Sequence, residues 1–292
     1  MAIILLFSGI SPMLSYRHGY HAGNYADVLK HAILLQVLKA MHKKDKAFVY
    51  VDTHAGAGAY SLEDEFAQKT GEYLDGVAKL WDKTDLPLAL KDYVAAVKTF
   101  NAEQDELSLY PGSPAFVDSE LRPQDRMVLH ELHGTDHELL SDYFAKDRQV
   151  KVIKGDGLAG LIAAVPPLER RGVVLIDPSF EIKTDYQDVA DAIIKAHKRF
   201  STGVFMLWYP VVDREQTEAM LSKLKNSGIT KQLRLEQGIK TDSNEFGMTA
   251  AGLWIINPPW QLDELAKDSL DYLAKTLGGI DGHVTVKWEV GE

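Results

Sequence analysis

The chain of 292 residues contains no cysteine. This absence excludes disulfide bonds, thiolate metal sites, iron–sulfur clusters and any covalent cysteine mechanism. It also fits a protein of the reducing cytoplasm, which is the location we expect.

Long apolar runs are missing as well. The N-terminal stretch MAIILLFSGISP is too short to span a bilayer and lacks the basic start of a signal peptide. We therefore expect no membrane partner, and we interpret residues 1–12 as an N-terminal extension with little structural role.

Positive charge is scarce, since the net charge is −10. A generally basic nucleic-acid binder is disfavoured, so a nucleic-acid partner would have to be held by a local positive patch. Residues 13–46 supply a candidate, because they contain six lysines and arginines against two aspartates.

One apolar run ends abruptly in polar and aromatic residues. Residues 173–176 (VVLI) show no polar alternation, as expected for a parallel strand that is covered on both faces. Ligands bind beyond the carboxyl ends of such strands, where Asp177, Pro178 and Phe180 follow. A carboxylate and the Pro178 carbonyl can accept the two hydrogens of an exocyclic amine, while an aromatic face stacks on the base. A plain strand exit with an Asp-Pro turn is the alternative interpretation of these four residues.

A glycine-rich turn follows an earlier strand. Residues 48–51 form the expected strand, Asp52 ends it, and Gly56 and Gly58 permit close approach of a ligand to the backbone. A dinucleotide fingerprint would need a third glycine where Ser61 stands. The turn therefore favours S-adenosylmethionine (AdoMet), with Asp52 as the nearby acid.

Two further predicted strands end in acids. Glu131 follows the strand at 127–130 and can accept both hydroxyls of a ribose, and Asp156 follows the strand at 150–153 and can accept from a purine amino group. With Asp52 and Asp177, four acids follow four apolar strands, which is far more specific than any one of them.

The pattern as a whole predicts an α/β sheet of buried parallel strands with a helical insertion after the first strand. We assign residues 13–60 and 126–292 to the domain built on this sheet and 61–125 to the insertion. Within the insertion we expect helices at 72–81 and 88–100, and a rigid turn at 110–114 that contains Ser113. 

A helix is expected from the N-cap residue Asn24 to about Met41. On the sequence alone, Lys30 within it is expected to be solvated and His31 half-buried.

Two rival motifs are set aside. His130-Glu-Leu-His133 does not have the spacing of a helical zinc site, so no metal is expected. Asn257-Pro-Pro-Trp260 offers the same kind of hydrogen-bond acceptors for an amine as Asp177-Pro-Ser-Phe180. It follows a late strand, however, and we expect it not to be catalytic.

Several longer motifs carry a resemblance over nearly the whole chain after residue 12. They are MLSYRH, HAGNYADVLKH, VDTHAGAG, YPGSP, the pair Asp156-Gly157, RRGVVLIDPSFE with KTDY, LWYPVV, GMTA and INPPW. In these motifs the chain resembles the RlmJ-type bacterial 23S rRNA (adenine-N6)-methyltransferases. The resemblance implies that the α/β sheet is a Rossmann-like, AdoMet-dependent methyltransferase sheet with a helical insertion after the first strand, and that residues 13–60 and 126–292 form the methyltransferase domain.

The resemblance implies roles for named residues. AdoMet, the methyl donor, would contact His31, His54, Ser113, Glu131, Asp156, Gly157 and Asp177. Asp177 would also be the catalytic acceptor, and Tyr16, His18, Lys30, Pro178 and Phe180 would meet the substrate. The implied partner is 23S rRNA, either protein-free or in an early assembly intermediate, and the enzyme is expected to be a monomer.

One departure from the family pattern concerns the reaction loop. The family has Asp-Pro-Pro-Tyr or a close variant, whereas this chain has Ser179 and Phe180. We expect activity to survive. Methylation of DNA adenine or of another amine, and a non-catalytic module that binds AdoMet and RNA, remain as alternatives.

Overall fold

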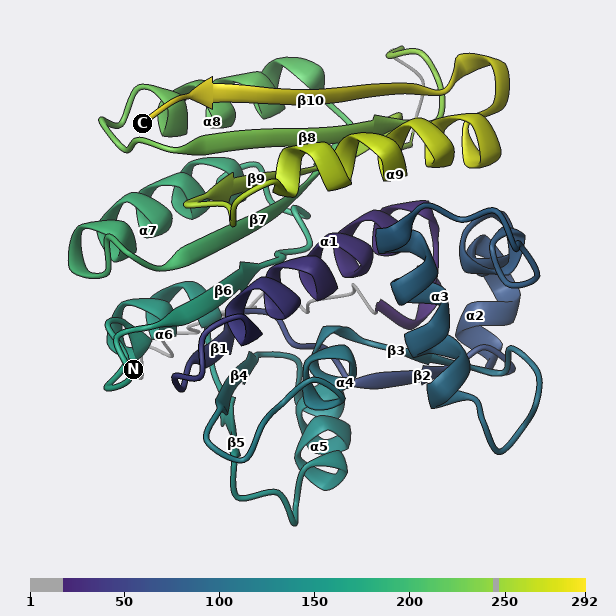
Figure 1. The fold of residues 1–292 in the computed structure, drawn as a ribbon, viewed down its shortest axis with the longest axis horizontal. Helices are drawn as coiled ribbons and strands as arrows, with labels where there is room; N and C mark the ends of the chain where they lie inside the picture. Colours follow the sequence, from purple (N-terminus) through teal and green to yellow (C-terminus); the bar gives the residue numbers. More distant parts are fainter. Residues whose placement is uncertain (1–17, 244–246) are drawn as a thin grey trace, which may run out of the picture.

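The computed structural model describes residues 18–243 and 247–292. Within these residues eight strands form one sheet in the order β10-β8-β9-β7-β6-β1-β4-β5 (Figure 1). The strands are β1 (Val49–Asp52), β4 (Arg126–Glu131), β5 (Val150–Lys154), β6 (Gly172–Ile176), β7 (Val204–Val211), β8 (Gln232–Gly238), β9 (Ala250–Ile256) and β10 (His283–Val290). The five strands from β7 to β5 are parallel, whereas β9 is antiparallel to β7 and β8, and β10 is antiparallel to β8.

Helices cover both faces of this sheet (Figure 1). One face packs against α1 (Tyr25–His42), α4 (Ser113–Asp118), α5 (Gly134–Tyr143) and α9 (Leu262–Leu277). The other packs against α6 (Gly157–Ala164), α7 (Asp185–Arg199) and α8 (Arg214–Lys225). The strand order reverses between β1 and β6, and ligands of open α/β sheets bind at that point. The predicted α/β sheet is thus confirmed.

Helix α1 is buried along most of its length. The Asn24 side chain accepts hydrogen bonds from the amides of Ala26 and Asp27, so the predicted N-cap is confirmed. The predictions of a solvated Lys30 and a half-buried His31 were wrong: Lys30 is 4% exposed and His31 is 1% exposed. Every residue from 25 to 38 is buried because α1 lies between the sheet and the inserted segment.

The segment at 61–125 contains α2 (Glu65–Thr70), the 3-10 turns η2 (Glu72–Asp75) and η3 (Val77–Lys79), α3 (Leu88–Phe100), β3 (Leu109–Pro111) and α4. The predicted helix at 88–100 is confirmed. The helix at 72–81 was wrong: Gly76, at φ −116° and ψ −111°, separates two short turns. A Cβ at Gly76 would lie 2.1 Å from the Gly23 carbonyl oxygen, so this backbone passes directly against the start of α1.

The expected turn at 110–114 is instead the end of a strand and the start of a helix. β3 pairs with β2 (Ala59–Ser61), and α4 begins at Ser113 with Pro114 in its first turn. Val28, Ala32 and Leu35 of α1 share an apolar cluster with this segment. The division into a domain and an insertion at 61–125 remains a prediction.

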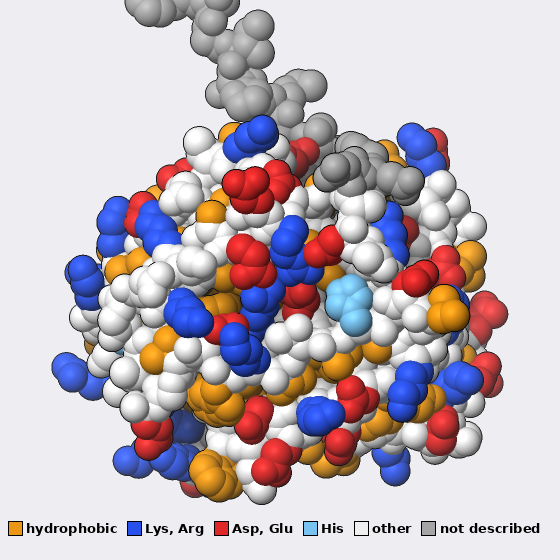
Figure 2. All heavy atoms as spheres, turned by 90° about the horizontal axis from the view of Figure 1, so that it is seen from above, with side chains coloured by type: hydrophobic (Ala, Val, Ile, Leu, Met, Phe, Trp, Pro, Cys, Tyr) orange, Lys and Arg blue, Asp and Glu red, His pale blue; other side chains and the backbone are white. Residues whose placement is uncertain are grey.

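At one edge of the sheet, β10 is exposed. The face seen there mixes basic and acidic side chains without a large patch of one sign (Figure 2). Lys287 and Glu289 on β10 pair with each other at 3.0 Å, and charges on an edge strand disfavour pairing with another chain. No helix in the described ranges, 18–243 and 247–292, is long and apolar enough to cross a membrane.

Candidate active site

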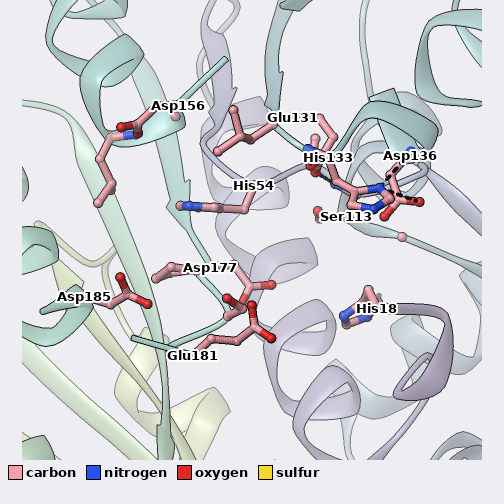
Figure 3. A pocket seen from close by; sticks show the side chains of 18 of the residues that line it. His18, His54, Ser113, Glu131, His133, Asp136, Asp156, Asp177, Glu181 and Asp185 are labelled. Carbon is pink, nitrogen blue, oxygen red and sulfur yellow. Dashed lines mark hydrogen bonds and ion pairs between the residues drawn. The ribbon is translucent and has the colours of Figure 1, made fainter. Parts of the chain in front are cut away.

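A cavity of about 430 Å³ opens at the carboxyl ends of the parallel strands. The residues that line it include the end of β4, the segments that follow β1, β5 and β6, and residues of α1 and α4 (Figure 3). All seven residues predicted to contact AdoMet line it: His31, His54, Ser113, Glu131, Asp156, Gly157 and Asp177. We call it the donor cavity.

A second cavity, of about 310 Å³, adjoins the first. Phe180, Trp208 and Met248 are among its lining residues, and we call it the acceptor cavity. Five residues line both cavities and so form a shared wall: His18, Lys30, Asp177, Ser179 and Glu181.

A chain of ion pairs runs through the shared wall. Lys30 Nζ donates to Asp177 Oδ2 at 2.6 Å and lies 2.8 Å from Asp27 Oδ1. Asp27 Oδ2 lies 2.8 Å from His18 Nε2. Residues that are 147 positions apart in the sequence are therefore joined at the end of β6.

Backbone amides hold the Glu131 side chain at the end of β4. Its two oxygens accept from the amides of Gly56 and His133, each at 2.7 Å. Burial raises the pKa of the Glu131 carboxyl. Each carboxylate oxygen has a further lone pair, so the group retains capacity to accept ligand hydroxyls.

The Asp156 side chain caps α6. Its Oδ1 accepts from the amides of Leu158 and Ala159 at 2.8 and 3.2 Å. The second residue of the pair, Gly157, has no room for a side chain, because a Cβ there would lie 1.8 Å from the Thr53 carbonyl oxygen. Gly157 therefore brings the backbone of α6 directly against the end of β1.

Asp52 does not line the donor cavity, which corrects the expectation for the acid near the glycine turn. It is fully buried and accepts from the hydroxyls of Tyr50 and Ser113, both at 2.7 Å, and from the His54 amide. Its place is structural, because it fixes Ser113 and the loop of His54 at the cavity wall.

Two histidines in the donor cavity are held neutral. Burial lowers the pKa of His54 to about 4, and His54 Nδ1 lies 2.7 Å from the Thr53 hydroxyl. Burial and the neighbouring Lys30 lower the pKa of His31 well below its usual value. His31 Nδ1 lies 2.8 Å from the Tyr110 hydroxyl, whereas its buried Nε2 has no hydrogen-bond partner among the described residues.

The low pKa of His54 makes stability depend on pH. Between its usual pKa of 6.5 and about 4, unfolded chains take up a proton that the folded protein does not. We therefore expect the free energy of unfolding to fall as the pH decreases through that window, and to fall less in His54→Asn. Urea unfolding at about pH 7 and about pH 5 measures this difference. The exposed His283→Asn is the control, and an equal pH response in His54→Asn and wild type would contradict the prediction.

Phe180 faces the acceptor cavity rather than the donor cavity. Its ring centroid lies 4.7 Å from that of Tyr186 and 6.3 Å from that of Trp208. The backbone of Phe180 is in the left-handed region at φ 53°, which is uncommon for an aromatic residue and is typical of functional loops.

Sequence reasoning missed two residues of this site. Asp27 was not singled out, although its i,i+3 spacing from Lys30 on α1 was a signal for an ion pair. Trp208, in the middle of strand β7, has the Lys30 ammonium 5.9 Å from its ring centroid. Tyr16 and the predicted extension at 1–12 lie outside the described residues.

The predicted basic patch is not gathered at the cavities. Lys43, Lys44 and Lys46 are exposed beyond the end of α1, whereas Lys30 is near its start. A helix of 18 residues is about 27 Å long. These lysines therefore lie at the opposite end of the parallel strands from the cavities, where the strands begin. 

The rival motif at Asn257 also lies at the end of the sheet where the parallel strands begin. Because β9 is antiparallel to β7, its last residue, Ile256, pairs with Phe205 near the start of β7. Asn257 is in the left-handed region at φ 54°, and its side-chain amide donates to the carbonyls of Ser201 and Gly203. Its surroundings are those of a structural turn.

We expect Asn257→Ala to leave methyl transfer unchanged and to lower the free energy of unfolding by about 1–2 kcal/mol, because it removes these hydrogen bonds and strains the backbone. Urea unfolding beside a rate assay tests both parts. Asn257→Gly is the matched control, since glycine relieves the strain but not the lost bonds. A large loss of rate in Asn257→Ala would contradict the assignment.

No group of three or more histidine, aspartate or glutamate side chains in the described part of the chain is arranged to hold a metal ion. The polar groups of the donor cavity are instead engaged with backbone amides and hydroxyls, as in the case of Glu131 and Ser113.

Comparison with known proteins shows which family this chain is similar to. The model of the family "Ribosomal RNA large subunit methyltransferase D, RlmJ" matches residues 45–290. The Ribosomal RNA large subunit methyltransferase J of Escherichia coli (strain K12) is 48% identical over 281 residues, which cover 96% of this chain and 100% of the relative. The protein of the same name from Haemophilus influenzae is 47% identical over 277 residues, covering 94% and 99% of the two chains.

A solved structure agrees over the same length. The crystal structure of a protein from Legionella pneumophila str. Philadelphia 1 superimposes with a TM-score of 0.86 at 39% identity, and covers 92% of this chain and 98% of that one.

The sheet order and the cavity at its switch point define a Rossmann-like methyltransferase. Within that class, the chain belongs to the RlmJ family of ribosomal RNA large subunit methyltransferases. The predicted enzyme class, an AdoMet-dependent rRNA methyltransferase, is thereby confirmed.

Proposed function

We propose that the protein transfers a methyl group from AdoMet to N6 of a specific adenine in 23S rRNA. The observation that carries this proposal is the position of Asp177, which lines both the donor and the acceptor cavity. A group on the shared wall can meet the acceptor nitrogen at the point where it approaches the methyl donor.

The donor cavity fits AdoMet chemically. The buried His31 Nε2, which has no hydrogen-bond partner in the part of the chain that the structure describes, is a polar atom at this cavity that a ligand can satisfy. Glu131 would accept the ribose hydroxyls, and Asp156 Oδ2 would accept from the adenine amino group. A cationic sulfonium is tolerated here because His54 and His31 are neutral at physiological pH. When bound, AdoMet supplies an electrophilic methyl group.

The acceptor adenine would leave its stack and enter the acceptor cavity. Flipping costs a few kcal/mol, which stacking on Phe180 partly offsets. Lys30 holds Asp177 Oδ2, so Oδ1 is left to accept one N6 hydrogen while the Pro178 carbonyl accepts the other. These bonds favour a tetrahedral N6 as the new N–C bond forms and the S–C bond breaks, and a proton then leaves N6 by way of Asp177.

The proposal also specifies the form of the RNA substrate, the oligomeric state of the enzyme and the salt dependence of RNA binding. The substrate would be 23S rRNA without bound proteins, or in an early assembly intermediate, in the bacterial cytoplasm, and the enzyme would act as a monomer. Because the net charge is −10, phosphates must be met by local lysines and arginines, and binding should weaken with salt.

The test is transfer of a tritiated methyl group from AdoMet to deproteinised 23S rRNA from a strain that lacks this gene. Label recovered as N6-methyladenosine would support donor, acceptor and position together. Label in another nucleoside, or only in DNA offered in parallel, would contradict the proposed acceptor. AdoMet binding without any transfer would favour the non-catalytic alternative.

A further inference from the structure

We propose that Asp27 is a positioning residue of the methyl-transfer site, which holds Lys30 against Asp177 and at the same time anchors His18 on the shared wall. This inference rests on the proposed function, because it assigns Asp27 a part in the same reaction.

The Asp27 carboxylate is the hub of the ion-pair chain. It is 2% exposed, and each of its oxygens is engaged: Oδ1 lies 2.8 Å from Lys30 Nζ, and Oδ2 lies 2.8 Å from His18 Nε2. The Gly23 amide also donates to Oδ2, at 3.0 Å. A carboxylate with this many partners cannot turn without releasing two residues of the shared wall.

The position of Asp27 in the helix is itself favourable. It lies in the first turn of α1, where unpaired amides and the helix dipole stabilise a negative charge. Burial alone would raise the pKa of Asp27, but His18 and Lys30 lower it well below the usual range. The side chain is therefore a fixed anion at the start of α1.

Lys30 needs such an anchor. A lysine side chain is a flexible stem that carries three donors, and only a second contact fixes which donor meets Asp177. Burial would lower the pKa of Lys30, but the carboxylates of Asp177 and Asp27 raise it. The titratable and aromatic groups around Lys30 are Asp27 and His31 on α1, His18 on η1 (His18–Tyr20), Asp177 and Glu181 after β6, and Trp208 on β7.

The experiment compares Asp27→Asn with wild type in single-turnover methyl transfer under saturating AdoMet and RNA. Asparagine preserves the size of the side chain but removes its charge. We expect the rate to fall by about 10²-fold, as for a misplacement of about 1 Å, while the Kd for AdoMet changes by less than about twofold. A lower rate with unchanged AdoMet affinity distinguishes a positioning role from a general loss of stability.

Asp92→Asn is the matched control. Asp92, on α3, pairs at 2.6 Å with Lys39 of α1, the helix that carries Asp27, and lines neither cavity. We expect it to leave both the rate and the Kd for AdoMet unchanged. Asp27→Glu, which restores the charge, should recover part of the lost rate.

A wild-type rate in Asp27→Asn would overturn the inference. So would losses of AdoMet affinity and of rate by the same factor, since they would assign Asp27 to general stability. Failure of this inference alone leaves wild type active and Asp177→Ala inactive. Failure of the proposed function removes N6-methyladenosine from the wild-type reaction itself.

Discussion

Asp177→Ala is expected to reduce the single-turnover rate of methyl transfer by at least about 10³-fold, because it removes an acceptor that meets N6 only where donor and acceptor cavities join. The fold should survive. Lys30 keeps Asp27 as a partner at 2.8 Å, so its buried ammonium is not left uncompensated. The measurement is the rate at saturating AdoMet and RNA, beside the thermal unfolding of each variant.

Asp177→Asn tests the charge of the side chain separately from its shape. Its amide oxygen can still accept one hydrogen bond, but it carries no charge to stabilise the positive charge that develops on N6. We expect its rate to lie between those of wild type and Asp177→Ala. If Asp177→Ala retained a rate within tenfold of wild type, the reacting group would have to be sought elsewhere on the shared wall.

The strand pattern made the donor cavity predictable. Parallel strands end at one edge of a sheet, so acids such as Glu131, Asp156 and Asp177 that follow apolar runs must gather there. The structure places all three on one cavity. The same reasoning could not show that Asp52 does not line this cavity. Asp52 is held elsewhere by hydrogen bonds from Tyr50 and Ser113, which depend on tertiary packing.

The environment of α1 could not be predicted from local sequence. Lys30 has the composition of a surface lysine, and its burial depends on Asp177, which lies 147 positions away. The same holds for Gly76, whose interruption of a helical pattern follows from its contact with Gly23. In both cases a helix propensity is local information, whereas the deciding contact is between segments that are distant in the chain.

A second large effect is expected from Lys30→Met. The change leaves the Asp27 and Asp177 carboxylates facing each other without the ammonium between them, at sites that are 2% and 14% exposed. Removing one partner of a buried ion pair destabilises a protein by about 3–5 kcal/mol, whereas an exposed pair contributes about 1 kcal/mol or less. Methyl transfer should fall as well, because Asp177 Oδ2 loses the donor that holds it.

The pH dependence of this loss identifies its cause. Burial would raise the pKa of Asp27, but His18 and Lys30 lower it, so the stabilisation is present above the usual pKa of 3.8 and disappears as the pH falls toward the lower folded-state value. Urea unfolding of wild type and Lys30→Met should therefore show the largest gap near neutral pH and a smaller one in acid. Lys39→Met, which removes the lysine of the partly exposed pair with Asp92, should show a small gap at neutral pH. Equal gaps in the two variants would mean that the buried chain from His18 to Asp177 contributes no more than a surface ion pair.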